Sequence, residues 1–154
     1  MEPRSLKYLT DACGGELRNG SPLRLATNIC TDSRKAGPGD LFFALSGERF
    51  DAHKFLPEVA KTGVIAVVAE RQKIPADFIT TVIAVDNTRV ALGNLAARYR
   101  RDFDLPIIAV GGSNGKTTTK ELLASVLRQK FKTLSGEASF NNDVGVPITL
   151  LKLN

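Results

Sequence analysis

The stretch that most constrains the fold of this chain is residues 107–119, which read IIAVGGSNGKTTT. Residues 107–110 are apolar and mostly β-branched, which predicts a buried strand. A glycine-rich loop follows, and the next segment places four apolar residues at helical spacing, namely Leu122, Leu123, Val126 and Leu127. A strand, a glycine loop and a helix in this order are the context in which a Lys-Thr pair binds phosphate.

The loop and the helix start carry the groups that a nucleotide needs. Glycines let backbone N–H groups close around phosphate oxygens, and the helix N-terminus adds a partial positive charge. Lys116 can reach the terminal phosphates as the catalytic cation, and the Thr117 hydroxyl can ligate a bridging Mg²⁺ ion. We therefore predict an ATP site made of the following residues: Gly111, Gly112, Ser113, Asn114, Gly115, Lys116, Thr117 and Thr118.

The loop departs from the strict phosphate-loop pattern at one position. That pattern places a glycine five residues before the second glycine, where this chain has Val110. The alternative interpretation is a glycine-rich turn that binds nothing. A Lys-Thr pair directly after the glycine, at a helix start behind an apolar strand, favours the nucleotide site.

Composition and charge limit the partners and the compartment. The net charge of +5 is scattered and fits anionic small substrates, whereas the lack of basic–aromatic interleaving argues against nucleic acid. Cys13 and Cys30 have no metal-ligand spacing and are expected to be free thiols. The N-terminus does not resemble a signal peptide, and the longest apolar run, residues 64–69, is too short to span a membrane. We expect a cytoplasmic monomer without membrane insertion.

Residues 1–100 alternate between apolar and turn-forming segments and predict an α/β fold. Ser5 is expected to cap a first helix, which Gly14 and Gly15 end. Strands are expected at residues 23–29, 41–45, 64–69 and 79–85, and further helices at 55–61 and 87–100. Because several of these strands are apolar throughout, we expect a parallel-type sheet covered by helices on both faces.

The chain is expected to divide near Leu105. Residues 1–86 would form a small N-terminal α/β domain, 87–104 a connecting helix, and 105–154 the first part of a P-loop, Rossmann-like ATP-binding domain. A doubly wound sheet needs several strands, and no acidic strand end that could act as a second metal ligand follows the loop. We therefore expect the chain to be a fragment of a larger enzyme.

Several motifs resemble those of the Mur ligase family. Residues 111–119 (GGSNGKTTT) resemble its ATP loop, and residues 140–151 (FNNDVGVPITLL) resemble a segment of its MurF type. The other motifs resemble the family's UDP-substrate domain: TDSR at 31–34, GDLFFAL at 39–45 and GERFDAH at 47–53. Ala52 stands where the family usually has Gly, and Gly111 where it often has Thr.

The resemblance implies an ATP-dependent carboxylate–amine ligase of peptidoglycan precursor synthesis. ATP would phosphorylate the terminal carboxylate of UDP-N-acetylmuramoyl-tripeptide, and the amine of D-alanyl-D-alanine would displace phosphate from the acyl phosphate. The family's further metal-binding carboxylate, its carbamylated lysine and its C-terminal domain would lie beyond Asn154, so the chain alone is expected to be inactive. Two alternatives stay open: a sister ligase that adds another amino acid, and a nucleotide-binding module without ligase chemistry.

Four residues are candidates for the UDP end of the substrate. Arg34 and Arg49 could bind the diphosphate because a guanidinium fork matches phosphate oxygens, or they could be solvated surface residues. Asp32 and Ser33 could take polar groups of uracil or ribose, or simply close a turn after the strand.

Three further residues complete the candidate substrate site. His53 is the single histidine, and by residue type alone it is more often structural than catalytic; the resemblance makes it a candidate substrate-pocket residue rather than an acid–base catalyst. The oxygens of Asn141 or Asn142 could orient the substrate or a metal-bound water. Their alternative role is to cap a helix that begins near Gly145.

Overall fold

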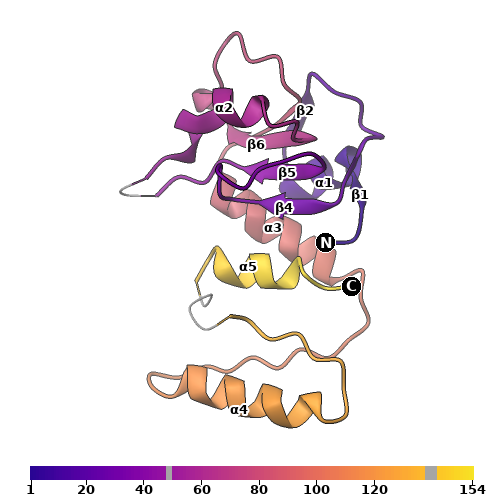
Figure 1. The fold of residues 1–154 in the computed structure, drawn as a ribbon, viewed down its shortest axis with the longest axis vertical. Helices are drawn as coiled ribbons and strands as arrows, with labels where there is room; N and C mark the ends of the chain where they lie inside the picture. Colours follow the sequence, from indigo (N-terminus) through magenta and orange to yellow (C-terminus); the bar gives the residue numbers. More distant parts are fainter. Residues whose placement is uncertain (48–49, 138–141) are drawn as a thin grey trace.

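The computed structural model describes residues 1–47, 50–137 and 142–154, so Arg49 and Asn141 lie outside the described residues. Within them, a five-stranded sheet with the order β2-β7-β6-β5-β4 lies in the upper part of the molecule in Figure 1. Its parallel strands are β4 (Asn28–Cys30), β5 (Asp40–Phe43), β6 (Ala66–Glu70) and β7 (Val82–Val85). The predicted α/β class with a parallel sheet is confirmed.

The remaining strands are short: β1 (Arg4–Ser5), β2 (Glu16–Arg18) and β3 (Leu25–Ala26). The sequence pattern does not mark β2, which pairs antiparallel with β7, because Leu17 is its one apolar residue. The single strand expected at residues 23–29 is wrong: β3 pairs with β1, whereas β4 joins the main sheet. The break falls at Thr27, whose N–H donates to the carbonyl of Gly39. The strand expected at 79–85 begins only at Val82.

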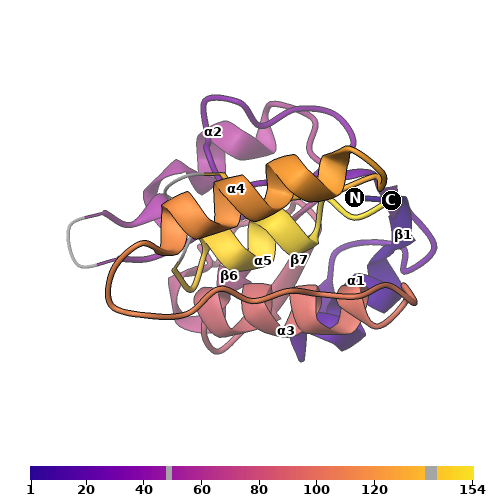
Figure 2. The same cartoon turned by 90° about the horizontal axis from the view of Figure 1, so that it is seen from below.

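Helices cover both faces of the sheet, as predicted. The helical elements of this part of the chain are α1 (Leu6–Cys13), the 3-10 turn η1 (Ala52–Phe55), α2 (Leu56–Ala60), the 3-10 turn η2 (Arg71–Lys73) and α3 (Thr88–Arg100). α1 and α3 pack side by side on one face, and α2 covers the other (Figure 2). Successive strand residues point to opposite faces. Phe43 and Val68 therefore join the core beneath α1 and α3, whereas Phe42 and Val67 join the core beneath α2.

Side chains and glycines fix the ends of the helices where the sequence places them. The Ser5 Oγ accepts the N–H of Tyr8 at 3.2 Å, and Gly14 ends α1 at a φ of 65°. The Asn87 Oδ1 accepts two N–H groups at the start of α3, from Arg89 and Val90, each at 3.0 Å. The cap expected at Ser5 is confirmed, and Asn87 caps α3 in the same way.

The strand predicted at residues 107–110 does not form, and Ile107 and Ile108 are more than half exposed. A parallel strand needs a neighbour to complete its hydrogen bonds. No strand among the described residues lies beside this segment. The helix predicted after the loop does form, as α4 (Lys116–Arg128), and it lies at the far end of the molecule from the sheet (Figure 1).

The last described segment returns to the first part of the chain. α5 (Gly145–Leu150) packs against α3, and Leu151 is buried in the core beneath α1 and α3. The Tyr99 hydroxyl accepts the N–H of Glu2 and donates to the carbonyl of Leu153, both at 2.8 Å. None of the helices in the described part of the chain is long and apolar enough to cross a bilayer.

Candidate functional site

The loop at residues 111–115 leads directly into α4, and all five of its residues are exposed. Gly112 has a φ of 137° and Gly115 a φ of 75°. Both values lie in the region that favours glycine because a Cβ atom would strain the backbone there. The path of this loop therefore depends on glycine at these two positions.

The start of α4 presents unpaired backbone donors. The first helical hydrogen bond that involves the loop runs from the N–H of Thr119 to the carbonyl of Gly115 at 2.9 Å. Among the described residues, the N–H groups of Lys116, Thr117 and Thr118 donate to no acceptor, as is usual in the first turn of a helix. Such donors at a helix N-terminus suit an anion.

Lys116 folds back over its own loop. Its Nζ donates to the carbonyl of Gly112 at 2.7 Å and to that of Ser113 at 3.2 Å. The ammonium group thus lies beside the loop that leads to the free N–H groups at the start of α4. One short segment combines an ammonium, free amides and the exposed Thr117, which is the donor set that a nucleotide phosphate chain requires.

The Thr117 hydroxyl fits a Mg²⁺ ion that also binds phosphate oxygens, because Mg²⁺ takes oxygen ligands and retains several waters. In the described ranges, no group of three or more His, Cys, Asp or Glu side chains could hold a metal ion. The fit of Mg²⁺ therefore depends on this hydroxyl together with the nucleotide.

A second candidate site lies at the carboxyl end of β4. A pocket of about 460 Å³ is lined by Thr31, Asp32, Ser33, Arg34, Phe50, Ala52 and Phe55. Ligands of parallel sheets bind outside the carboxyl ends of the strands. The rings of Phe50 and Phe55 stack with centroids 5.8 Å apart and give the pocket an aromatic wall.

Asp32 and Arg34 pair with each other inside this pocket. The Arg34 Nε and Nη2 donate to the two carboxylate oxygens of Asp32 at 2.9 and 2.8 Å. The hydrogen bond from Arg34 lowers the pKa of Asp32 to about 2. The Arg34 side chain stays 85% exposed, so its remaining N–H groups face solvent and are open to an anionic ligand.

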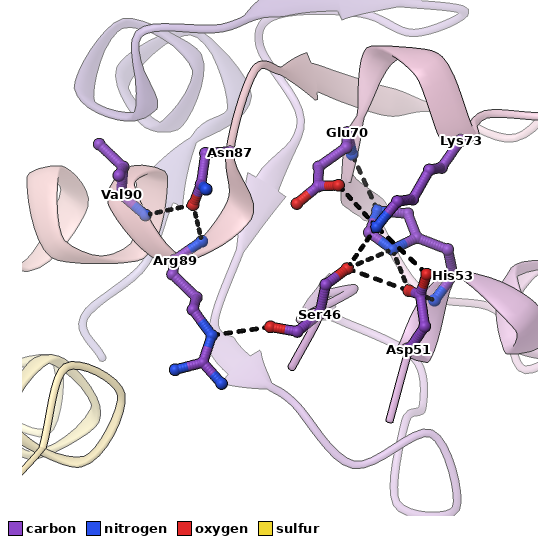
Figure 3. A network of polar contacts seen from close by, with 8 residues as sticks. All are labelled: Ser46, Asp51, His53, Glu70, Lys73, Asn87, Arg89 and Val90. Carbon is purple, nitrogen blue, oxygen red and sulfur yellow. Dashed lines mark hydrogen bonds and ion pairs between the residues drawn. The ribbon is translucent and has the colours of Figure 1, made fainter. Parts of the chain in front are cut away.

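His53 lies in a separate polar network (Figure 3). Its ring is buried, the Nδ1 is 2.6 Å from the Asp51 Oδ1, and the Nε2 accepts the N–H of Glu70 at 2.9 Å. Because the Nε2 accepts, the ring proton is on the Nδ1, which donates to Asp51. Both ring nitrogens are thus used within the chain, where they hold the loop before α2 against the end of β6.

The same network has the residue types of a nucleophilic triad without its geometry. The Ser46 Oγ lies 3.3 Å from the His53 Nδ1, the same nitrogen that contacts Asp51, and it accepts from the Lys73 Nζ at 2.7 Å. A triad needs the serine and the acid on opposite ring nitrogens. Burial raises the pKa of Asp51, but hydrogen bonds from His53 and Lys73 outweigh this effect and hold it well below its usual range.

Asn142 caps α5. Its Oδ1 accepts the N–H of Gly145 at 2.8 Å and that of Val144 at 3.2 Å. This geometry matches the alternative role predicted for this residue, which is to cap the helix that begins near Gly145. Its side-chain oxygen is therefore occupied within the chain.

Comparison with protein families matches both parts of the chain. The model described as "Mur ligase family, catalytic domain" matches residues 26–100, which contain the pocket, and the "Mur ligase middle domain" matches residues 110–154, which contain the loop. The chain belongs to the Mur ligase family. The resemblance seen in the sequence is confirmed.

The relatives of this Mur ligase chain include MurF proteins. It is 48% identical to the UDP-N-acetylmuramoyl-tripeptide–D-alanyl-D-alanine ligase of Synechocystis sp., over 97% of the chain and 33% of that ligase. A crystal structure of MurF from Acinetobacter baumannii superposes with a TM-score of 0.92 at 42% identity, over 100% of the chain and 34% of that structure. MurF from Thermotoga maritima in complex with ADP gives a TM-score of 0.72 at 32% identity, over 80% and 28%. The chain spans about a third of the length of these relatives.

The structure brings most of the sequence-predicted residues of this Mur ligase chain together in two places, whereas His53 and Asn142 lie in neither. Asp32, Ser33 and Arg34 share the pocket, and the predicted ATP-site residues share the loop and the start of α4. The sequence reasoning missed Phe50 and Phe55, although their position on either side of the DAHK segment is a visible signal.

Proposed function

We propose that this chain supplies the UDP-substrate pocket and the phosphate loop of an ATP-dependent ligase that joins D-alanyl-D-alanine to UDP-N-acetylmuramoyl-tripeptide. The observation that carries the proposal is the loop at 111–118, where two positive-φ glycines, free amides, an ammonium group and a hydroxyl lie at one helix start. The identity to MurF ligases over nearly the whole chain supports these substrates.

The loop's task is to neutralise the charge of the transferring phosphoryl group. In the proposed reaction, Lys116 leaves the carbonyls of Gly112 and Ser113 and binds terminal phosphate oxygens. The free N–H groups at the start of α4 hold the neighbouring oxygens. Thr117 would hold Mg²⁺, which would supply further positive charge when bound.

The pocket at the end of β4 is proposed to bind the UDP end of the substrate. Asp32 orients the guanidinium of Arg34, which offers its free N–H groups to the diphosphate. Asp32 and Ser33 are proposed to meet polar groups of uracil or ribose. His53 shapes the loop behind the pocket through its two hydrogen bonds, and Arg49 remains a proposed diphosphate ligand.

We propose the same domain division that the sequence predicts. Residues 1–86 would form the substrate domain, 87–104 the connecting helix and 105–154 the start of the ATP-binding domain. The gap between the two family matches, at residues 101–109, supports a boundary near Leu105. The free thiols of Cys13 and Cys30 support a cytoplasmic location, and we propose a monomer.

The test is a ligation assay with the full-length protein, ATP, Mg²⁺ and both substrates. We expect phosphate release only when UDP-N-acetylmuramoyl-tripeptide and D-alanyl-D-alanine are both present, and a UDP-linked pentapeptide in the mass spectrum. The 154-residue chain alone should release none. Activity with a different amino acid would indicate a sister ligase, and nucleotide binding without any ligation would indicate a non-catalytic module.

A further inference from the structure

Arg89, in the first turn of α3, joins two segments that are far apart in the sequence. Its Nε donates to the carbonyl of Ser46 at 2.7 Å (Figure 3). Its Nη1 donates to the Asp143 Oδ2, also at 2.7 Å. One planar guanidinium therefore fixes both segments relative to α3 and to each other.

The first segment consists of Ser46 and Gly47, which are paired with Phe50 and Asp51. Ser46 and Asp51 form a β-bridge, and the N–H of Gly47 donates to the carbonyl of Phe50 at 2.7 Å. Phe50 lines the pocket at the end of β4. Because Arg89 binds the carbonyl of Ser46, the position of Arg89 affects the position of Phe50 through these pairs.

The second segment is the turn before α5. Asp143 directly follows Asn142, whose side chain caps that helix. α5 in turn packs against α3, the helix that carries Arg89. The ion pair between Arg89 and Asp143 therefore joins the matched "middle domain" region to the matched "catalytic domain" region.

The backbone of Arg89 is fixed at the start of α3, where its N–H donates to the Asn87 Oδ1 at 3.0 Å. A Cβ atom on Gly47 would lie 3.2 Å from the Arg89 Nη2, so the guanidinium lies close against the loop backbone. A lysine carries its donors on a single nitrogen, so it cannot place two separate nitrogens against Ser46 and Asp143 as the planar fork of Arg89 does.

We propose that Arg89 is a positioning residue of the ligase: it sets residues 46–47, with Phe50 bonded to them, and the Asp143 turn in one arrangement that binds the UDP-linked substrate. This inference rests on the proposed function. It assigns Arg89 no contact with substrate or nucleotide. Phe50 lines the pocket, and none of the hydrogen bonds of Arg89 reaches residues 111–118. Replacing Arg89 is therefore expected to weaken the binding of the UDP-linked substrate and not that of ATP.

The experiment compares Arg89→Ala and Arg89→Lys with the wild type in the full-length protein. We expect both variants to raise the KM for the UDP-linked substrate about 3- to 10-fold, because hydrogen bonds of a partly exposed charge are lost. The KM for ATP should stay within about twofold. Arg18→Ala is the matched control, since Arg18 also pairs with a carboxylate but lies on the edge strand β2.

Hydrogen exchange provides a readout that needs no ligase activity. In Arg89→Lys, which retains the charge and the helical residue, we expect faster exchange both at Gly47 and at Val146, with β6 unchanged. An unchanged KM for the UDP-linked substrate would overturn the proposal, as would equal rises in both KM values. If the wild type ligates nothing, the proposed function fails, and unchanged exchange at Gly47 and Val146 would then overturn the positioning role as well.

Discussion

Replacing each loop glycine by alanine tests whether the backbone path of the phosphate loop matters for nucleotide binding. Gly111 has no positive φ and nothing within 4 Å of an added Cβ, so alanine fits there. Gly115, at a φ of 75°, also has room, but the left-handed conformation costs alanine about 1–2 kcal/mol. Gly112, at a φ of 137°, lies in a region where such strain reaches about 1–3 kcal/mol.

If nucleotide binding requires the backbone conformation that this loop has here, the free energy needed to hold alanine in it is subtracted from the free energy of binding. We expect Gly111→Ala to stay within about twofold of the wild type, Gly115→Ala to bind about 5- to 30-fold more weakly, and Gly112→Ala about 5- to 150-fold more weakly. The measurement is a titration with fluorescent ADP in the presence of Mg²⁺, with a melting curve for each variant. A Gly111→Ala variant as weak as Gly112→Ala would refute the reasoning.

Three further predictions test the cation, the core and the acid response. Lys116→Ala should weaken ADP binding about 10- to 150-fold in the same titration, and unchanged affinity would exclude its role. Tyr99→Phe should lower the free energy of unfolding by about 1–3 kcal/mol, because two partly buried backbone groups lose their hydroxyl partner; an unchanged urea midpoint would contradict this. The pKa of Asp51 is lowered in the folded state, so the stability that the ionised carboxylate contributes is present above the unfolded pKa and is lost as the pH falls below about 4. Asp51→Asn should therefore reduce the dependence of the free energy of unfolding on pH in this range, measured by urea unfolding at several pH values. An unchanged pH dependence would argue against this role of Asp51.

The parts of the fold that the sequence predicts are those set by local or periodic signals. Phe42 and Phe43 point to opposite faces, which explains why a run of apolar residues predicts a sheet covered on both sides. The caps at Ser5 and Asn87 depend on neighbours within three residues. Such signals need no knowledge of the rest of the chain.

The parts that fail depend on distant partners. Residues 107–110 have the composition of a strand but no neighbouring strand among the described residues. The roles of His53 and Arg89 depend on Glu70, Ser46 and Asp143, none of which is marked in the sequence as their partner. A residue's type indicates which bonds it can form, whereas the fold decides where it forms them.

The hydroxyl of Tyr99 ties the carbonyl of Leu153 to the amide of Glu2, and Arg100 holds the carbonyl of Leu105. The polypeptide therefore departs from the body formed by the sheet and α3 at one anchored point and rejoins it at another. The loop at residues 111–115 lies on the excursion between them, which is held at both ends. Because both ends of this excursion are held by α3, residues 111–115 can move only as far as the length of the intervening chain allows.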